Sequence, residues 1–167
     1  MNGEELRRRY TAGERNFADL DLSGVNISGI DPDLDLAAYD ELCPDFAADL
    51  SGINLSKANL TNAILAGANL TNAILTGANL TDAALDRCNL TDVDFSGANL
   101  TRAYLSGAEF QRTIMRKVDF LYADISQTPF FSADVAGAKN INTVNFGGTS
   151  VQLVLDDGTV IDEDHNW

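Results

Sequence analysis

The sequence predicts an all-β solenoid whose chain turns every five residues around a narrow hydrophobic axis. From Leu50 to Val135 an apolar residue occupies every fifth position. Alanine or another small residue stands two positions before most of these centres. Neither the period of 2 of an ordinary strand nor the period of 3.6 of an amphipathic helix explains this spacing. A short fixed repeat is instead typical of a solenoid, whose units stack on one another.

We interpret each five-residue unit as one short extended segment followed by a turn. In an extended chain the side chains of residues i and i+2 share a face, so the centre and its small residue both point inward. Ser or Thr follows the centre in eleven of the eighteen units from residue 48 to 137, and Gly recurs one position later. Both residue types suit turns, and Gly tolerates positive φ. If four units close one coil, every fourth centre falls in the same column; the number of sides stays open at this point.

The chain begins with a predicted helix over residues 2–13. Asn2 is a candidate N-cap, Glu5 is placed to complete a capping box, and Gly13 ends the helix. Leu6 and Tyr10 lie at i and i+4 and give the helix one small apolar face. An open coil exposes unpaired backbone groups, so we expect this helix to cover one end of the solenoid.

The five-residue count starts directly after the helix, in a different frame. Over residues 15–29 the large positions are Phe17, Leu22 and Ile27. The frame then fails, because the separation of 23 positions between Ile27 and Leu50 is not a multiple of five. Residues 30–47 are therefore expected to leave the stack as an inserted acidic loop. From residue 48 to 137 the main β-helix follows.

The repeat ends after residue 137. Two β-forming runs, Val151–Leu155 and Thr159–Ile161, flank an Asp-Asp-Gly turn signal and predict a hairpin. We expect residues 138–167 to form a cap at the far end and a loose tail. The whole chain, 1–167, is predicted to be a single domain.

The repeat units resemble a known family. Units such as ANLTN and ANLTD match the loose motif A-(D/N)-L-x-x of the pentapeptide repeat proteins, strongly over residues 48–137 and weakly over 15–29. The opening ELRRRYTAGERNFADLDLSG is similar to the N-terminal caps of bacterial members, which are numerous in cyanobacteria. This resemblance implies a right-handed quadrilateral β-helix. The chain departs from the motif in its shifted frame before Leu50 and its weaker units after Glu109.

Composition limits the possible functions. No apolar run is long enough to span a membrane, and the N-terminus lacks the apolar stretch of a secretory signal, so we expect a cytoplasmic protein without a membrane partner. The two cysteines, Cys43 and Cys88, form no metal or disulfide pattern, and the single histidine, His165, lies in the polar tail. No phosphate-binding Gly motif occurs. We therefore predict no enzyme, no catalytic or metal site, no cofactor and no small-molecule substrate.

Two functions remain, and the distribution of charge separates them. Some pentapeptide repeat proteins bind DNA gyrase through an acidic β-helix that resembles duplex DNA, and the net charge of −14 invites this comparison. Residues 48–137, however, carry nine acids and six bases, whereas residues 30–47 alone carry six acids. Duplex DNA has one charge per ~1.7 Å of axis, which this rod does not match. A structural or protein-binding scaffold of undefined role is the primary hypothesis, and a gyrase-directed DNA mimic is the alternative.

Two sets of residues are candidate protein contacts. The acidic loop has a basic protein surface as its natural partner, because a long insertion that leaves a regular stack is often functional. The second set consists of apolar residues at outward positions, although scattered exposed apolar residues are also common without function. We expect a monomer or weak dimer that does not bind nucleic acid directly. The candidates are Asp31, Asp33, Asp35, Asp40 and Glu41 in the loop, and Ile64, Ile74 and Tyr104 on the rod.

Overall fold

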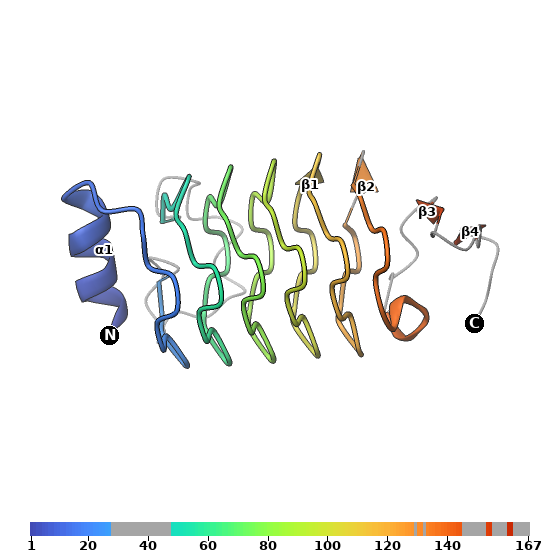
Figure 1. Cartoon of the computed structure of the whole chain (residues 1–167), viewed down its shortest axis with the longest axis horizontal. Helices are drawn as coiled ribbons and strands as arrows, with labels where there is room; N and C mark the ends of the chain where they lie inside the picture. Colours follow the sequence, from blue (N-terminus) through green and yellow to red (C-terminus); the bar gives the residue numbers. More distant parts are fainter. Residues whose placement is uncertain (28–47, 129, 132, 145–152, 155–159, 162–167) are drawn as a thin grey trace.

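The chain forms a stack of flat coils with a helix at its N-terminal end (Figure 1). The fold is taken from a computed structural model, in which residues 1–27, 48–128, 130–131, 133–144, 153–154 and 160–161 are described. Parallel bridges join residues 20 positions apart, for example Asn59 to Asn79 and Asn79 to Asn99. One coil therefore holds four five-residue units, which answers the question that the sequence left open.

The four units of a coil define four sides of the stack, and we label the sides by the residue that bridges to the next coil. Side A and side C carry mostly asparagine and acidic residues, whereas side B and side D carry most of the outward apolar residues. Residues on sides B and D are half a coil apart, so these two sides face in opposite directions. Between residues 49 and 134 the isolated bridging residues are Asp49, Asn69, Asn89 and Glu109 on side A; Asn54, Ile74, Asp94, Ile114 and Asp134 on side B; Asn59, Asn79, Asn99 and Asp119 on side C; and Ile64, Ala84, Tyr104 and Asp124 on side D.

Regular strands are short because each side offers few residues between two turns. Strand β1 (Phe110–Gln111) pairs in parallel with strand β2 (Phe130–Phe131), with Phe110 opposite Phe130. The other coil-to-coil pairings described are isolated bridges. The predicted β-structure is therefore present as single-residue bridges rather than as long strands.

The corners of the coils are β-turns with one left-handed residue. In the unit around Leu60, Asn62 has φ 56° and the N–H of Ala63 donates to the carbonyl of Leu60 at 2.9 Å. A positive φ at the third residue of such a turn is the mark of type II geometry. Glycine takes this position in six units of residues 48–137, as the sequence suggested, but other residues take it in eleven. The geometry is therefore imposed by the stack and not by glycine alone.

Unit 59–63 shows how the backbone donors are satisfied. Leu60 and Asn62 donate to carbonyls of the following coil, and Asn59 donates to the preceding one. Ala63 closes the turn, and the remaining N–H, that of Thr61, donates to the side-chain oxygen of Asn59 at 3.2 Å. All five donors of the unit have partners, as buried or stacked backbone requires.

The predicted centres form the core. Leu50, Leu60, Leu70, Leu80, Leu90, Leu100, Phe110 and Phe120 are at most 1% exposed. The small residues two positions earlier are buried beside them, except Ala48, which is half-buried. Where a polar residue replaces alanine it finds an internal acceptor: Thr113 donates to the carbonyl of Leu90 at 2.9 Å. Cys88 is fully buried, and burial raises the pKa of its thiol to about 12, which makes it the unreactive core thiol that its inward position predicts.

Helix α1 (Gly3–Thr11) covers the first coil and is slightly shorter than the predicted 2–13. The Asn2 side chain accepts from the N–H of Glu5 at 2.8 Å, which confirms the N-cap. The second half of the expected capping box is replaced, because the Glu5 carboxylate accepts from Arg8. Leu6 is fully buried, and the Tyr10 hydroxyl donates to the Ser51 carbonyl at 2.7 Å, so the helix is fixed to the stack.

The first coil belongs to the stack in the frame that the sequence indicates. Phe17, Leu22 and Ile27 are fully buried. Asp21 bridges to Asn59 across a sequence separation of 38, whereas the separation between later coils is 20. The frame break is thus absorbed between these two coils, and the predicted acidic loop, residues 30–47, lies outside the described residues.

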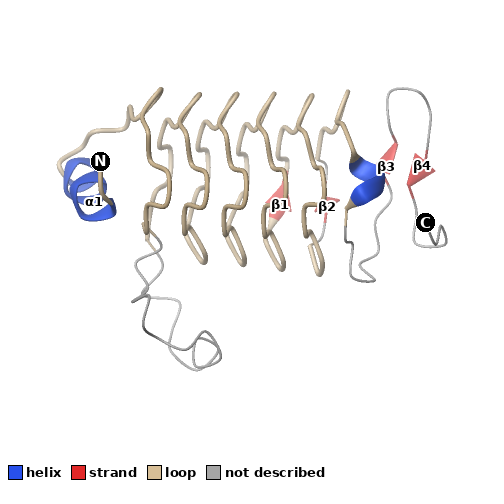
Figure 2. Ribbon diagram, turned by 90° about the horizontal axis from the view of Figure 1, so that it is seen from below, coloured by secondary structure: helices blue, strands red, loops and turns tan. Residues whose placement is uncertain are grey.

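At the C-terminal end the coils give way to other elements. Lys139 still bridges to Asp119, and the 3₁₀ helix η3 (Ile141–Thr143) follows. Strands β3 (Leu153–Val154) and β4 (Val160–Ile161) are antiparallel, with register Leu153 to Ile161, as the predicted hairpin requires. They lie at the end of the stack opposite α1 (Figure 2), and the turn between them lies outside the described residues.

Candidate functional site

The outward apolar residues that the sequence singles out lie on two opposite sides. Ile64 and Tyr104 share side D and are 38% and 52% exposed. Ile74 is on side B with Ile114, and these two are 42% and 39% exposed. The predicted set therefore divides into two surfaces that one flat partner surface does not contact together. The five predicted acidic-loop contacts lie outside the described residues, so their grouping stays a prediction.

Side D carries a combination that sequence reasoning missed. Ala84 stands between Ile64 and Tyr104 in the bridging column, and Asp86 lies two residues beyond Ala84 in the same coil. Tyr122 is 65% exposed at the corner where the next coil turns onto this side. A signal for Asp86 was present in the sequence, since no other unit from 48 to 137 has an acid directly after the centre. Only the fold shows that it shares a surface with Tyr104.

The Asp86 carboxyl is held in an unfavourable environment for its charge. Burial raises its pKa, and the negative charge of Asp124 raises it further. Hydrogen bonds from the backbone of Asp86 itself and of Ser106, with the charge of Arg87, act in the opposite direction but do not cancel the rise. Serine or threonine is the usual residue at this position. The ionised carboxylate of Asp86 therefore destabilises the fold on side D, which the serine or threonine in most other units does not.

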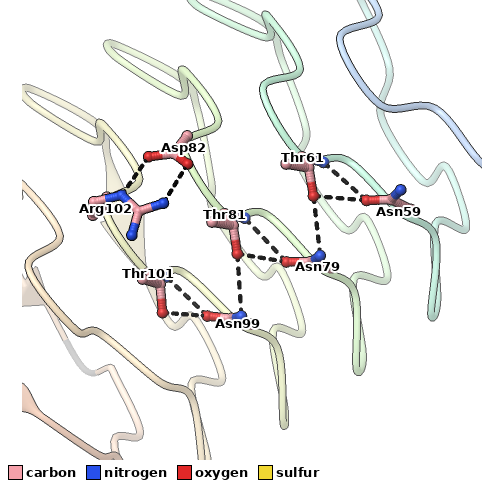
Figure 3. Close-up of polar contacts among 8 residues, drawn as sticks. All are labelled: Asn59, Thr61, Asn79, Thr81, Asp82, Asn99, Thr101 and Arg102. Carbon is pink, nitrogen blue, oxygen red and sulfur yellow. Dashed lines mark hydrogen bonds and ion pairs between the residues drawn. The ribbon is translucent and has the colours of Figure 1, made fainter.

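Side C is chemically different, because its polar side chains bind one another (Figure 3). The Thr81 hydroxyl donates to Oδ1 of Asn79 at 2.7 Å, and the Asn79 amide donates to the Thr61 hydroxyl of the preceding coil at 3.0 Å. The same pattern links Asn99 to Thr81 at 3.1 Å. In this asparagine–threonine ladder the side chains bind one another within the stack, and the charged Asp82 and Arg102 at the adjacent corners are paired with each other.

Arginines compensate several of the acids along the rod. Arg102 binds Asp82 one coil away through two hydrogen bonds, and Arg112 binds Asp92 in the same way. In each pair the arginine hydrogen bond holds the pKa of the aspartate below its usual value. Arg116 similarly pairs with Asp134 at 2.5 Å. These acids do not form a continuous array of uncompensated charge.

Two further kinds of site, a metal site and a membrane span, are relevant to the described part of the chain. Within those residues no group of three His, Cys, Asp or Glu side chains is arranged to hold a metal ion. No described helix is long and apolar enough to cross a membrane.

Comparison with protein families identifies the repeat. A family model described as pentapeptide repeats matches residues 53–92 and 94–130 in eight copies. The repeat region of this chain belongs to the pentapeptide repeat family. Among proteins with curated descriptions, none matches the sequence.

Solved structures of pentapeptide repeat proteins are similar to the chain. Rfr23 from the cyanobacterium Cyanothece 51142 has 24% identity and a TM-score of 0.52, covering 86% of this chain and 99% of its own. A pentapeptide repeat protein of Nostoc PCC 7120 has 27% identity and a TM-score of 0.41, covering 86% and 94%. QnrB1, a plasmid-mediated fluoroquinolone resistance protein, has 16% identity and a TM-score of 0.39, covering 78% and 69%. The likeness to Rfr23 concerns the fold alone.

Proposed function

We propose that this pentapeptide repeat protein is a non-enzymatic scaffold that binds another protein through side D. The observation that carries the proposal is the exposure of Ile64 and Tyr104 in one column of a rigid stack, with Tyr122 at its corner. Exposed aromatic side chains that are fixed in position are the residues that most often anchor protein interfaces. Side B, with Ile74 and Ile114, is the less favoured surface, because it has no exposed aromatic residue among those described.

The architecture we infer is the right-handed quadrilateral β-helix of the family. The four units per coil and the parallel bridges between successive coils support four sides, and the likeness to Rfr23 supports the handedness. In such a rod the interior is filled by the leucine, phenylalanine and alanine columns, so function belongs to the outward side chains. Members of the family are generally not enzymes, and we extend that property to this chain.

A site-specific photocrosslinking experiment tests the binding role. A photoreactive benzoylphenylalanine replaces Tyr104 on side D or, as the matched control, Glu109 on side A, which holds the equivalent position in the next unit. In host cells we expect a discrete crosslinked protein with the residue at 104 and none with it at 109. Equal crosslinking at both positions, or none at either, contradicts binding through side D.

Mimicry of DNA is the competing function, and the ion pairs count against it. An acidic mimic needs charge along its length, whereas Arg102 and Arg112 compensate acids of the rod. A gyrase supercoiling assay separates the two functions. We expect no inhibition at micromolar protein; inhibition that is lost when Asp82 and Asp92 are changed to asparagine would favour the mimic instead.

A further inference from the structure

The chemistry of the partner can be inferred from side D, on the premise that this side is the binding surface. We propose that side D binds a basic, extended segment of the partner protein, with an arginine or lysine side chain seated between Asp86 and Tyr104. The two residues lie in adjacent coils on the same side, as diagonal neighbours across the bridge from Ala84 to Tyr104. Successive coils stack at about the 4.8 Å spacing of hydrogen-bonded strands, which one long side chain spans.

The charges on side D favour a cation. Asp86 and Asp124 are close enough for their charges to oppose each other, and no ion pair to either carboxylate is seen among the described residues. Arg87 acts on Asp86 through its charge, but Asp86 remains harder to ionise than a free aspartate. A partner's cation placed at Asp86 relieves both effects at once, which is electrostatic complementarity in its simplest form.

The arginine nearest to Tyr104 in the sequence is already engaged. The guanidinium of Arg102 donates to Asp82 at 2.7 and 2.6 Å. That bidentate geometry fixes the arginine on the corner column rather than over Asp86. The surface between Asp86 and Tyr104 therefore keeps its acidic and aromatic character.

The apolar neighbours explain why the ligand is a basic side chain and not a small cation. Ala84, the smallest of the three side chains, stands between Ile64 and Tyr104 in one column of outward residues. Lysine and arginine carry aliphatic stems that cover such apolar surface while the charged end meets a carboxylate. The ring of Tyr104 adds an attraction for the cation.

Asp86 also breaks the rule of its own repeat. At the same position the next two coils of side D carry Ser106 and Ser126, whose hydroxyls are 3.0 Å apart. A serine there fits the ladder without a desolvated charge. Departures from an otherwise consistent pattern that cost stability are typical of functional positions.

The test is a titration of the labelled full chain, followed by NMR, with the peptide Ac-Arg-Val-Arg-Val-Arg-NH2. We expect shifts confined to side D, around Ala84, Asp86 and Tyr104. Changing Asp86 to asparagine keeps an acceptor for the backbone N–H groups, removes the charge and should weaken binding about fivefold, as expected for one partly exposed ion pair. The matched control is Asp94→Asn on side B, where the side chain caps the N–H of Ser96 and asparagine retains that cap.

Three outcomes overturn the proposal: equal weakening by the Asp86 and Asp94 substitutions, shifts centred on Ile74 and Ile114, or equally strong binding of the peptide Ac-Glu-Val-Glu-Val-Glu-NH2. The result is independent of the crosslinking experiment. If a partner crosslinks at position 104 but the Asp86→Asn substitution leaves that crosslink unchanged, the scaffold role stands and the basic partner does not. If no protein crosslinks at 104, binding through side D itself fails.

Discussion

Arg102 lies one coil beyond Asp82 and donates two hydrogen bonds to its carboxylate, from Nε at 2.7 Å and from Nη2 at 2.6 Å. Both residues occupy the left-handed corner position of their units, with φ 53° and 57°. The corner columns of the stack thus bring together side chains from successive coils that are distant in the sequence. The same geometry joins Arg112 to Asp92.

This pair predicts a change in titration. The pKa of Asp82 is low chiefly because Arg102 donates to it. We expect the Arg102→Gln variant to raise that pKa toward its ordinary value of 3.8, as followed by carboxyl NMR, while the pKa of Asp92 stays low. Because the folded-state pKa of Asp82 is depressed, the pair stabilises the fold fully above the ordinary pKa, and its contribution is lost as pH falls through the folded-state value. An unchanged Asp82 titration would refute this assignment.

The core predicts a large loss for a single truncation. Leu90 is fully buried within the stack. Leu90→Ala should reduce the free energy of unfolding by about 2–5 kcal/mol, because it removes buried methyl groups and leaves a cavity. Ile74→Ala, at a position that is 42% exposed, is the control and should cost less than about 1 kcal/mol in the same urea titration. Similar losses at both positions would contradict the inward orientation of Leu90.

The asparagine–threonine ladder predicts an order of stability among substitutions at Asn79. Asn79 accepts from the N–H and the hydroxyl of Thr81 and donates to Thr61. Alanine removes all three bonds and leaves a backbone donor without its cap, at a cost of about 1–2 kcal/mol. Aspartate keeps both acceptors and should cost less. Thermal unfolding of the two variants decides this, and equal losses would mean that the cap contributes nothing.

The contact between α1 and the first coil predicts that replacing Gly3 with alanine destabilises the fold, although this substitution usually stabilises a helix. In an isolated helix, alanine in place of glycine is stabilising by about 0.5–1 kcal/mol. At Gly3, however, an added Cβ would clash with the carbonyl oxygen of Asn26. We therefore expect Gly3→Ala to displace the helix and to speed hydrogen exchange in residues 16–27. Glu4→Ala, at an exposed position of the same turn, should leave that exchange unchanged.

Asp86 predicts a stabilising substitution with a defined pH dependence. Its pKa in the folded chain is above the ordinary value of 3.8, so the folded state is penalised once the carboxyl ionises. Asp86→Asn should raise the melting temperature at neutral pH. The gain should shrink as pH falls through the raised pKa and vanish below the ordinary one, where the carboxyl is protonated in both states. A gain that persists in acid would show that the effect does not come from this carboxyl.

Much of the fold could be predicted because one pattern repeats without interruption. Every fifth residue from Leu50 to Val135 is apolar, which fixes the turning of the chain before any coordinate is known. The helix and the C-terminal hairpin carry local signals, the Asn2 cap and the turn between two β-forming runs. The pairing of Glu5 with Arg8, in place of the expected capping box, was not predictable, because side-chain pairing on an exposed helix depends on small energy differences.

The candidate surface was less predictable, since period alone does not tell which side of a coil a residue occupies. Ile64, Ile74 and Tyr104 look equivalent in the sequence, yet the count of four units per coil places Ile74 opposite the other two. For the same reason, the proximity of Asp86 to Tyr104 cannot be predicted until the stacking of the coils is known. Predicting which side chains meet across two coils requires the length of a coil, which the residues did not reveal.

Because one coil holds four units, the number of residues between two positions determines the relative directions in which their side chains point. Removing a single unit from the middle of the rod would leave the axis filled but would rotate everything beyond the deletion by a quarter turn. Tyr104 would then look out beside the asparagines instead of above Ile64. Only insertions or deletions of whole coils preserve the direction of each side chain. The orientation of any recognition surface on this rod therefore depends on the number of residues between its parts.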